Sequence, residues 1–354
     1  MTDSRRVALK VLRKIDDEGA YANLVLGREL AQTDLEPRDR AFVTDLVYGV
    51  TRLRRRLDLL VDPWLLRPVD PPVRDALRLG AYQLKVLGTP PHAAVSATVS
   101  AVAAPKVRGF VNAVLRKVAG AIEPAWPSAA VELSYPDWIV DRLTADLGTD
   151  TALAALQAMN EPATVTERDD GYVQDPASQA VAALAAAPGL VLDVCAAPGG
   201  KATAMASVAS TVVASDVRHH RVDLIAGNAR RVGAANVRVV AADGTAPPYR
   251  PGSFDAVLVD APCSGLGTLR RRADARWRID EAAPERLAAL QRELLAAAAA
   301  LVKPGGLLTY SVCTLTKAES EEVASTIDWP VVETRLLLPQ DGTDGMYMVQ
   351  WRRP

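Results

Sequence analysis

The spacing of apolar residues changes character along this chain, and that change most constrains its fold. From residue 4 to about residue 120 the apolar residues recur at helical intervals, whereas from residue 172 onward short β-branched runs alternate with helical stretches. The β-α alternation indicates βαβ units on a parallel sheet, and the nearly all-apolar strands indicate helices on both faces of it. The sequence therefore predicts an all-α bundle followed by an α/β domain with a mostly parallel sheet.

Prolines divide the first part of the chain into separate helices. Segments such as RRVALKVLRKI and VRDALRLGAYQLKVL place apolar residues at i, i+3, i+4 and i+7, and Pro63, Pro68 and Pro71 fall between such segments. We expect a helical domain over residues 1–122, with six or seven helices. Residues 123–170 predict a connector with one or two helices, and residues 171–354 the α/β domain.

The formal net charge of -1 conceals an uneven distribution. Residues 1–120 have 20 Lys and Arg against 13 Asp and Glu, while the other residues have 21 against 29. A basic half suits a polyanion partner, although on charge alone a chance drift is equally compatible. Three cysteines are too few for a disulfide framework, and neither a signal peptide nor a membrane-length apolar segment is present. We expect a cytoplasmic monomer with no membrane contact.

The segment VLDVCAAPGGK predicts a cofactor loop at the carboxyl end of the first strand. Small residues there let the backbone approach a ligand closely. Asp216 ends the second strand, where an acid would hold ribose hydroxyls, and Asp243 ends the third, where it would reach an adenine edge. The pattern is not G-x-G-x-x-G, which argues against a dinucleotide. The predicted loop residues are Cys195, Ala196, Ala197, Pro198, Gly199, Gly200 and Lys201.

Two further motifs, DAPCSG and YSVCT, place Cys263 and Cys313 at the ends of the next two strands. Both thiols would open onto the same crevice as the cofactor loop. A thiolate that adds to carbon 6 of cytosine makes carbon 5 nucleophilic enough to take a methyl group from S-adenosylmethionine. Asp260 would then hydrogen-bond the base edge. This chemistry leaves the two thiols interchangeable.

These motifs, in this order, resemble the RNA cytosine-5 methyltransferases of the Fmu/Sun (NOL1/NOP2/Sun) family, together with VQDPASQ, RRRADARW, LVKPGG and DGTDGMYM. The first 120 residues resemble a NusB-like RNA-binding domain through RDRAFVTDLVYGVTR and VRGFVNAVLRKV. This pairing is typical of bacterial enzymes that act on 16S ribosomal RNA. The resemblance implies a Rossmann-like class I methyltransferase domain, S-adenosyl-L-methionine as cofactor and RNA as substrate.

The resemblance also implies individual roles. It makes Cys313 the nucleophile and gives Cys263 the release of the methylated RNA from the covalent adduct. It assigns cofactor contacts to Asp216, Asp243, Asp260 and the loop from Cys195 to Lys201, with Cys195 presenting only its backbone.

Two arginine clusters are candidates for RNA phosphate contact, against the alternative of a solvated helix face. They comprise Arg52, Arg54, Arg55 and Arg56, and Arg270, Arg271 and Arg272. Trp277 would stack on a base or anchor the core. The histidines are not spaced as metal ligands, and we expect no metal site.

One departure from the family concerns a small RNA-facing subdomain that relatives usually carry before the VQD segment. Here only about ten residues separate Pro162 from Val173, so we expect the subdomain to be missing or truncated. Two alternatives stay open: methylation of transfer RNA or another RNA, and a non-catalytic RNA-binding factor with a vestigial methyltransferase half. The presence of both thiols argues against the second.

Overall fold

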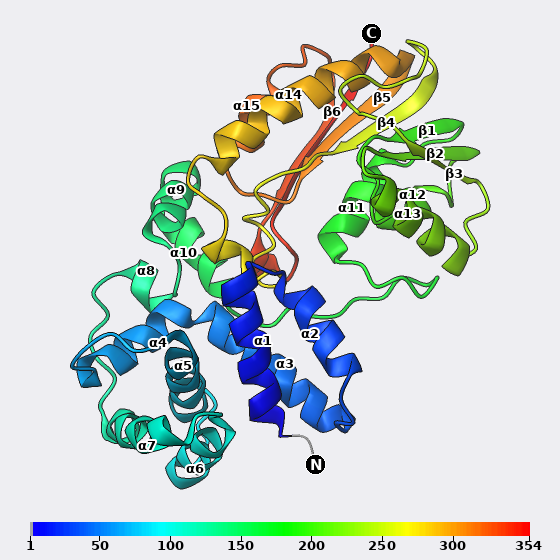
Figure 1. Cartoon of the computed structure of the whole chain (residues 1–354). Coiled ribbons are helices and arrows are strands. Elements are labelled where there is room, and N and C mark those ends of the chain that lie inside the picture. The colour runs from blue at the N-terminus through cyan, green and yellow to red at the C-terminus, as the bar shows by residue number, and fades with distance from the viewer. Residues whose placement is uncertain (1–2) are drawn as a thin grey trace. The chain divides into compact units, whose positions relative to one another are not determined.

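The computed structural model describes residues 3–354, apart from the side chain of Glu18, so Met1 and Thr2 of the predicted first domain lie outside the described residues. The chain forms two compact units (Figure 1). The helical unit is Met1–Val140 with Arg272–Arg278, and the sheet unit is Asp141–Arg271 with Ile279–Pro354. The short segment Arg272–Arg278 thus belongs to the first unit although the chain around it belongs to the second.

Helices alone build the helical unit, as predicted. Four of them begin with a proline at the first helical position, where the missing N–H costs nothing. The helices are α1 (Ser4–Glu18), α2 (Ala22–Ala31), α3 (Pro37–Arg52), α4 (Arg54–Val61), α5 (Pro71–Lys85), α6 (Pro91–Ala101), α7 (Pro105–Gly120) and α8 (Ala129–Glu132), with a 3-10 turn at Asp62–Trp64.

Close helix packing in this unit depends on two glycines. The Tyr82 ring of α5 fills the place where a Cβ on Gly49 of α3 would stand, and Leu115 of α7 does the same at Gly80. The segment Arg272–Arg278 adds a buried cation to the unit, because the fully buried Arg276 guanidinium lies 3.9 Å from the centre of the Tyr135 ring.

The sheet unit alternates strands and helices after three leading helices. α9 (Asp137–Leu147) starts at the unit boundary and α10 (Thr149–Ala158) follows. The remaining helices are α11 (Pro176–Ala185), α12 (Gly200–Met205), α13 (His219–Arg231), α14 (Ala283–Leu301) and α15 (Glu321–Ala324). The strands are β1 (Leu190–Asp193), β2 (Thr211–Asp216), β3 (Val237–Ala241), β4 (Phe254–Asp260), β5 (Val302–Val312), β6 (Val331–Leu337) and β7 (Met346–Arg352).

The seven strands form one sheet in the order β3-β2-β1-β4-β5-β7-β6. β1 to β5 pair in parallel, and β7 runs antiparallel between β5 and β6. The mostly parallel Rossmann-like sheet predicted from the alternation is therefore confirmed. The strand order reverses between β1 and β4, so the carboxyl ends of these strands flank the crevice where such sheets bind ligands.

Both faces of the sheet are apolar, since alternate strand residues enter two separate cores. Val191 and Leu258 pack with α11, α12 and α13, whereas Leu192 and Val257 pack with α14 and α15. Figure 1 shows α14 and α15 on one side of the sheet and α11, α12 and α13 on the other. This two-sided burial explains why the strands lack a polar alternation.

A tight hairpin stands where family members usually carry the small subdomain that we expect to be missing or truncated here. Glu167 and Val173 form a single antiparallel bridge, and Gly171 closes the turn at a φ of 77° that favours glycine. The Arg168 guanidinium lies 4.8 Å from the centre of the Tyr172 ring and donates to the Gly200 carbonyl at 2.6 Å. The hairpin therefore supports the cofactor loop directly.

Candidate active site

The two predicted thiols lie together. The Sγ atoms of Cys263, after β4, and Cys313, after β5, are 3.3 Å apart because β4 and β5 are parallel neighbours in register. Neither cysteine is in a disulfide, and both are half-buried. The hydrogen bond with Cys313, burial, and the negative charges of Cys313, Glu319 and Asp260 raise the pKa of Cys263 well above its usual value. Cys263 therefore holds its proton more firmly and can donate it in a hydrogen bond to the Cys313 sulfur.

A buried carboxylate that the sequence analysis missed ties the two cysteine loops together. Glu319 is 0% exposed, and its Oε1 accepts hydrogen bonds from the Ser264 backbone N–H at 2.7 Å and from Gln291 Nε2 at 3.2 Å. Its Oε2 accepts from Ser264 Oγ at 2.5 Å, Thr314 Oγ1 at 3.1 Å and Thr316 Oγ1 at 2.9 Å. Five donors satisfy this buried charge, and the residue after each cysteine is among them. The only sequence signal was an acidic residue shortly after YSVCT.

An ion pair lies beside the thiols. Lys201 Nζ, at the start of α12, is 2.7 Å from Asp260 Oδ2, and Ser311 Oγ donates to Asp260 Oδ1 at 2.8 Å. Burial acts to lower the pKa of Lys201, but Asp260, Cys313 and Asp193 outweigh it and the pKa is raised. Lys201 is thus a firmly held cation beside the cysteines, of the kind that favours a thiolate.

One buried carboxyl group, that of Asp193, lies just before the predicted cofactor loop. Asp193, at the end of β1, is 1% exposed, and neither of its carboxylate oxygens has a hydrogen-bond partner among the described residues. Burial and the charge of Asp260 raise its pKa to about 8. Burial likewise raises the pKa of the Cys195 thiol, which agrees with Cys195 taking no part in the chemistry. Asp193 was not among the site residues predicted from the sequence.

The rest of the loop is narrow and lined by backbone. Gly199 has a φ of 105°, and a Cβ on Gly200 would lie 3.0 Å from the Tyr172 ring, so both positions favour glycine. The carbonyls of Ala197 and Pro198 accept hydrogen bonds from Arg221 and Asn228 of α13. The site thus offers a backbone cradle of small residues and a partnerless acid, which fits a cationic nucleoside such as S-adenosylmethionine.

The two other predicted cofactor acids differ in their surroundings. Asp216 is buried at the end of β2, where it accepts from the Arg218 N–H and pairs with Arg221 at 3.2 Å. Asp243 is exposed after β3, and hydrogen bonds from the Thr245 backbone and hydroxyl lower the pKa of its carboxyl. Both acids follow parallel strands, so their strand ends share an edge with Asp193.

The second arginine cluster is largely internal. Arg270 is 6% exposed and bridges Asp175 at 2.8 Å and Asp344 at 2.6 Å, and Arg271 pairs with the same two carboxylates. These pairs join the VQD segment to the C-terminal DGTDG segment. RNA contact is therefore not supported at Arg270. Arg272 is exposed, and its contact with RNA stays a prediction.

The first cluster is also engaged within the protein. Arg52 is 7% exposed, which removes it from phosphate contact. Arg54, Arg55 and Arg56 pair with Asp16, Asp137 and Glu123, respectively. Trp277 donates its indole N–H to the Thr51 carbonyl at 2.7 Å and so acts as an anchor in the helical unit. RNA contact by Arg54 to Arg56 remains a prediction that must compete with these ion pairs.

The described residues include neither a metal-binding cluster nor a membrane-spanning helix. Between residues 3 and 354 no group of three or more His, Cys, Asp or Glu side chains is placed to hold a metal ion. No helix in the same range is both long and apolar enough to cross a membrane.

Comparison with known proteins agrees with both units. Residues 182–335 match the family described as 16S rRNA methyltransferase RsmB/F, and residues 2–120 match the NusB family. The crystal structure of PH0851 superposes with a TM-score of 0.80 at 21% identity over 98% of both chains. A methyltransferase homolog protein from Pyrococcus horikoshii has a TM-score of 0.54 at 21% identity, over 66% of this chain and 100% of that one. At these identities the structures support the fold alone.

Curated relatives are closer in sequence. The ribosomal RNA small subunit methyltransferase B of Thermus thermophilus is 37% identical over 399 aligned positions, covering 99% of this chain and 97% of the relative. The protein of the same name from Xanthomonas campestris is 34% identical over 90% of this chain and 86% of its own. Because 399 positions exceed the 354 residues here, at least 45 positions of the Thermus protein face gaps in this chain. The chain belongs to the RsmB/F family of ribosomal RNA small subunit methyltransferases, with an N-terminal NusB domain.

Proposed function

We propose that this protein transfers a methyl group from S-adenosylmethionine to carbon 5 of a cytosine in RNA of the small ribosomal subunit, through a covalent bond to Cys313. The observation that carries the proposal is the 3.3 Å separation of the two thiols beside the Lys201–Asp260 ion pair. This group lies at the sheet edge where the strand order reverses between β1 and β4. The curated relatives that are named for methylation of small subunit ribosomal RNA support this substrate.

The cofactor would be held by the small-residue loop from Cys195 to Lys201, with the Asp193 carboxyl facing a positive group and Asp216 and Asp243 facing its nucleoside. S-adenosylmethionine supplies an activated methyl group as a sulfonium when it is bound. Gly199 and Gly200 suit this tight loop, since a Cβ on Gly199 would lie 3.2 Å from the Ile225 Cα and a Cβ on Gly200 would lie 3.0 Å from the Tyr172 ring.

The thiols divide the work because their environments differ. Cys313 attacks carbon 6 as a thiolate, forming a carbon–sulfur bond and moving an electron pair to carbon 5, which then takes the methyl group. Alkylation removes the negative charge from Cys313, and with it one cause of the raised pKa of Cys263. Cys263 can then release its own proton to solvent and, as a thiolate, accept the proton that leaves carbon 5. The electrons left behind break the carbon–sulfur bond and restore the Cys313 thiolate.

The Lys201–Asp260 pair stabilises charge on the cytosine base as well as on the thiols. Charge builds up on the pyrimidine ring when sulfur adds to carbon 6, and a buried cation and acid at the ring edge stabilise such charge well. We assign this role to Lys201 and Asp260, and we assign Ser311 the positioning of the Asp260 carboxylate.

The test is methyl transfer from labelled S-adenosylmethionine to 16S ribosomal RNA, with transfer RNA assayed in parallel and the modified base located by bisulfite sequencing. Wild-type protein should label the ribosomal RNA, and Cys313→Ala should abolish labelling. Cys263→Ala should accumulate a protein–RNA adduct that survives denaturing gel electrophoresis, while Cys195→Ala should form no adduct. Full activity of Cys313→Ala would refute the covalent mechanism, and labelling of transfer RNA alone would refute the substrate.

A further inference from the structure

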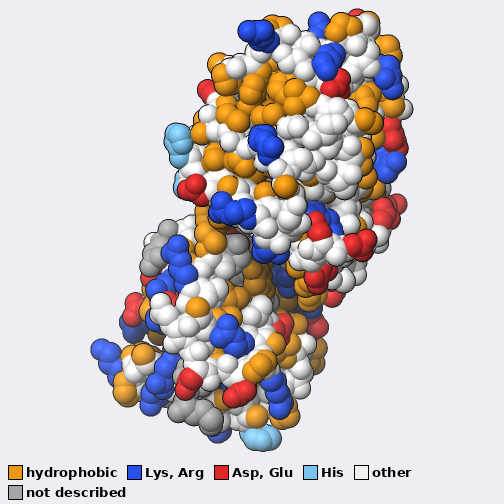
Figure 2. Space-filling view, turned by 90° about the vertical axis from the view of Figure 1, so that its right-hand side faces the viewer, with side chains coloured by type: hydrophobic (Ala, Val, Ile, Leu, Met, Phe, Trp, Pro, Cys, Tyr) orange, Lys and Arg blue, Asp and Glu red, His pale blue; other side chains and the backbone are white. Residues whose placement is uncertain are grey.

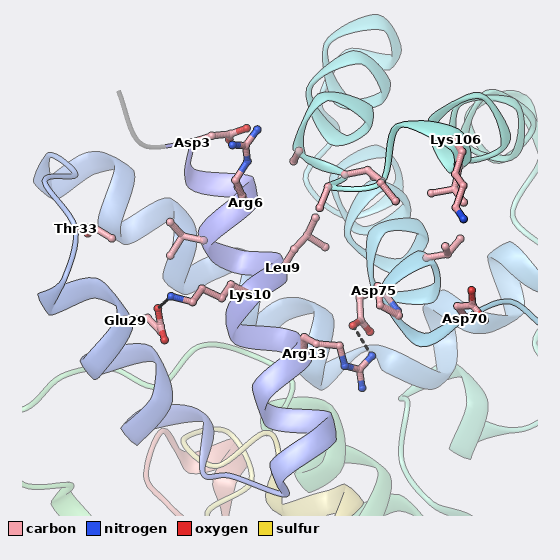
Figure 3. A pocket seen from close by; sticks show the side chains of 18 of the residues that line it. Asp3, Arg6, Leu9, Lys10, Arg13, Glu29, Thr33, Asp70, Asp75 and Lys106 are labelled. Carbon is pink, nitrogen blue, oxygen red and sulfur yellow. Dashed lines mark hydrogen bonds and ion pairs between the residues drawn. The ribbon is translucent and has the colours of Figure 1, made fainter.

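The helical unit contains two large cavities that share part of their lining. The first, of about 970 Å³, lies among α1, α2, α5 and the start of α7 (Figure 3). The second, of about 1060 Å³, lies between the segment Pro63–Val69 and α7. Asp70, Val73, Lys106 and Val107 line both cavities, so the two adjoin as one groove. We call it the α7 groove.

Four cations of the α7 groove make no ion pair or hydrogen bond with any described residue, in contrast to most other cations of the unit. Figure 3 shows Lys10 directed to Glu29 and Arg13 joined to Asp75, so these two charges are already satisfied. Four exposed cations of the groove have neither an ion pair nor a hydrogen bond with any described residue: Arg6, Arg67, Lys106 and Lys117. Three others of this kind between residues 3 and 120 lie outside the groove: Arg28, Arg38 and Arg116.

The groove also exposes flat and apolar side chains between these cations. Phe110 is 41% exposed on α7, Leu66 is fully exposed, and Trp64 is partly exposed beside Lys117, whose Nζ lies 5.7 Å from the centre of its ring. Figure 2 shows one face of the molecule, on which hydrophobic side chains lie between Lys and Arg side chains. Unpaired cations with aromatic rings between them are the surface that binds single-stranded nucleic acid, because bases stack on rings while phosphates contact the cations.

We propose that the α7 groove binds a single-stranded segment of the RNA substrate, with phosphates at Arg67, Lys106 and Lys117 and a base on Phe110. The proposal rests on the proposed function for its choice of RNA, and it moves the RNA contact of the helical unit away from the ion-paired Arg54–Arg56 cluster. An acidic protein segment would also satisfy the cations. It would make no use of exposed rings, however, and the rings therefore favour RNA.

The test is binding of a fluorescein-labelled single-stranded 12-nucleotide RNA to the full chain, measured by fluorescence anisotropy over a range of salt concentrations. The variant R67Q/K106Q/K117Q should bind more weakly, and the slope of log affinity against log salt should fall by about 2, since each single-strand phosphate contact contributes about 0.7. Phe110→Ala should weaken binding by about 5- to 150-fold through lost stacking.

Matched controls make the outcome specific. R28Q/R38Q/R116Q removes the same charge outside the groove, and Leu24→Ala removes an exposed apolar side chain of α2. Both should keep wild-type affinity and salt slope, and all four variants should keep the wild-type unfolding midpoint. Equal losses in the two triple variants would show a nonspecific charge effect and overturn the proposal. So would an acidic Asp/Glu peptide that binds as tightly as RNA, depends on the same three cations and is indifferent to Phe110→Ala.

Failure here is separable from failure of the proposed function. If the wild-type protein methylates ribosomal RNA and R67Q/K106Q/K117Q retains full RNA affinity, the groove assignment is wrong and the activity stands. If the wild-type protein methylates no RNA yet the groove variants lose RNA binding, the activity is wrong and the groove stands.

Discussion

Glu319 Oε1 lies 2.7 Å from the backbone nitrogen of Ser264, the residue that follows Cys263, while its Oε2 accepts from Thr314, the residue that follows Cys313. One fully buried carboxylate thus fixes the loops of both thiols. The 3.3 Å separation of the sulfurs depends on this brace as well as on the pairing of β4 with β5.

Replacing Glu319 should therefore damage the site and the fold together. In Glu319→Gln an amide nitrogen must face at least one hydrogen-bond donor, which leaves buried groups unsatisfied and should lower the free energy of unfolding by about 1–3 kcal/mol. Urea denaturation measures the loss. Glu321→Gln, on the exposed surface of α15, is the matched control and should be neutral. Equal stability of the two variants would contradict the bracing role.

The positioning role makes a second readout available. If Glu319 sets the distance between the sulfurs, Glu319→Gln should change the pH dependence of Cys313 alkylation by iodoacetamide, because the hydrogen bond between the thiols is disturbed. Glu321→Gln should leave that profile unchanged. A profile identical to wild type in a Glu319→Gln protein of reduced stability would leave Glu319 with a structural role only.

The two lysine–carboxylate pairs of the sheet unit should differ in strength. Lys201–Asp260 has side chains 13% and 26% exposed, whereas Lys303–Asp255, at a similar distance, has side chains 42% and 35% exposed. Water screens the second pair, so a double-mutant cycle on unfolding should give about 0.2–1 kcal/mol there and a larger coupling for Lys201–Asp260. Lys201→Ala should also abolish methyl transfer, and Lys303→Ala should not. A coupling at Lys303–Asp255 as large as that at Lys201–Asp260 would refute this ranking.

The sequence could predict the residues of this site that lie in short motifs at strand ends, but not those whose partners are far away in the sequence. The β-α alternation predicted the sheet, and strand ends placed Cys263, Cys313 and Asp260 at one edge, because parallel strands end together. Glu319 was missed because its importance comes from burial where three segments converge. Arg270 was read as an RNA contact because its partners, Asp175 and Asp344, are far away in the sequence.

Arg270 provides a direct test of that distinction. Arg270→Ala would leave two buried carboxylates short of a partner and should destabilise the protein by about 3–5 kcal/mol. Arg272 is two residues further on, is exposed, and makes neither an ion pair nor a side-chain hydrogen bond with a described residue, so Arg272→Ala should change stability by less than about 0.5 kcal/mol. Thermal and urea unfolding of both variants measure the difference. A stable Arg270→Ala protein with weakened RNA binding would restore the original assignment.

The raised pKa of Asp193 should make the stability of the cofactor-free protein depend on pH. Its pKa is about 8 in the folded chain against an ordinary value of 3.8, so the folded state binds more protons between these values. The stability it contributes is present below about pH 4 and is lost as pH rises toward 8, with a slope that approaches about 1.4 kcal/mol per pH unit. Asp193→Asn cannot ionise, so it should remove this dependence and unfold at higher urea than wild type at pH 8.5.

The same variant should bind S-adenosylmethionine more weakly in calorimetry, because the cationic ligand loses its buried counter-charge. Asp223→Asn, at an exposed position of α13, is the control and should change neither property. An Asp193→Asn protein with the wild-type pH profile and full cofactor affinity would show that the partnerless carboxyl at the end of β1 serves neither purpose.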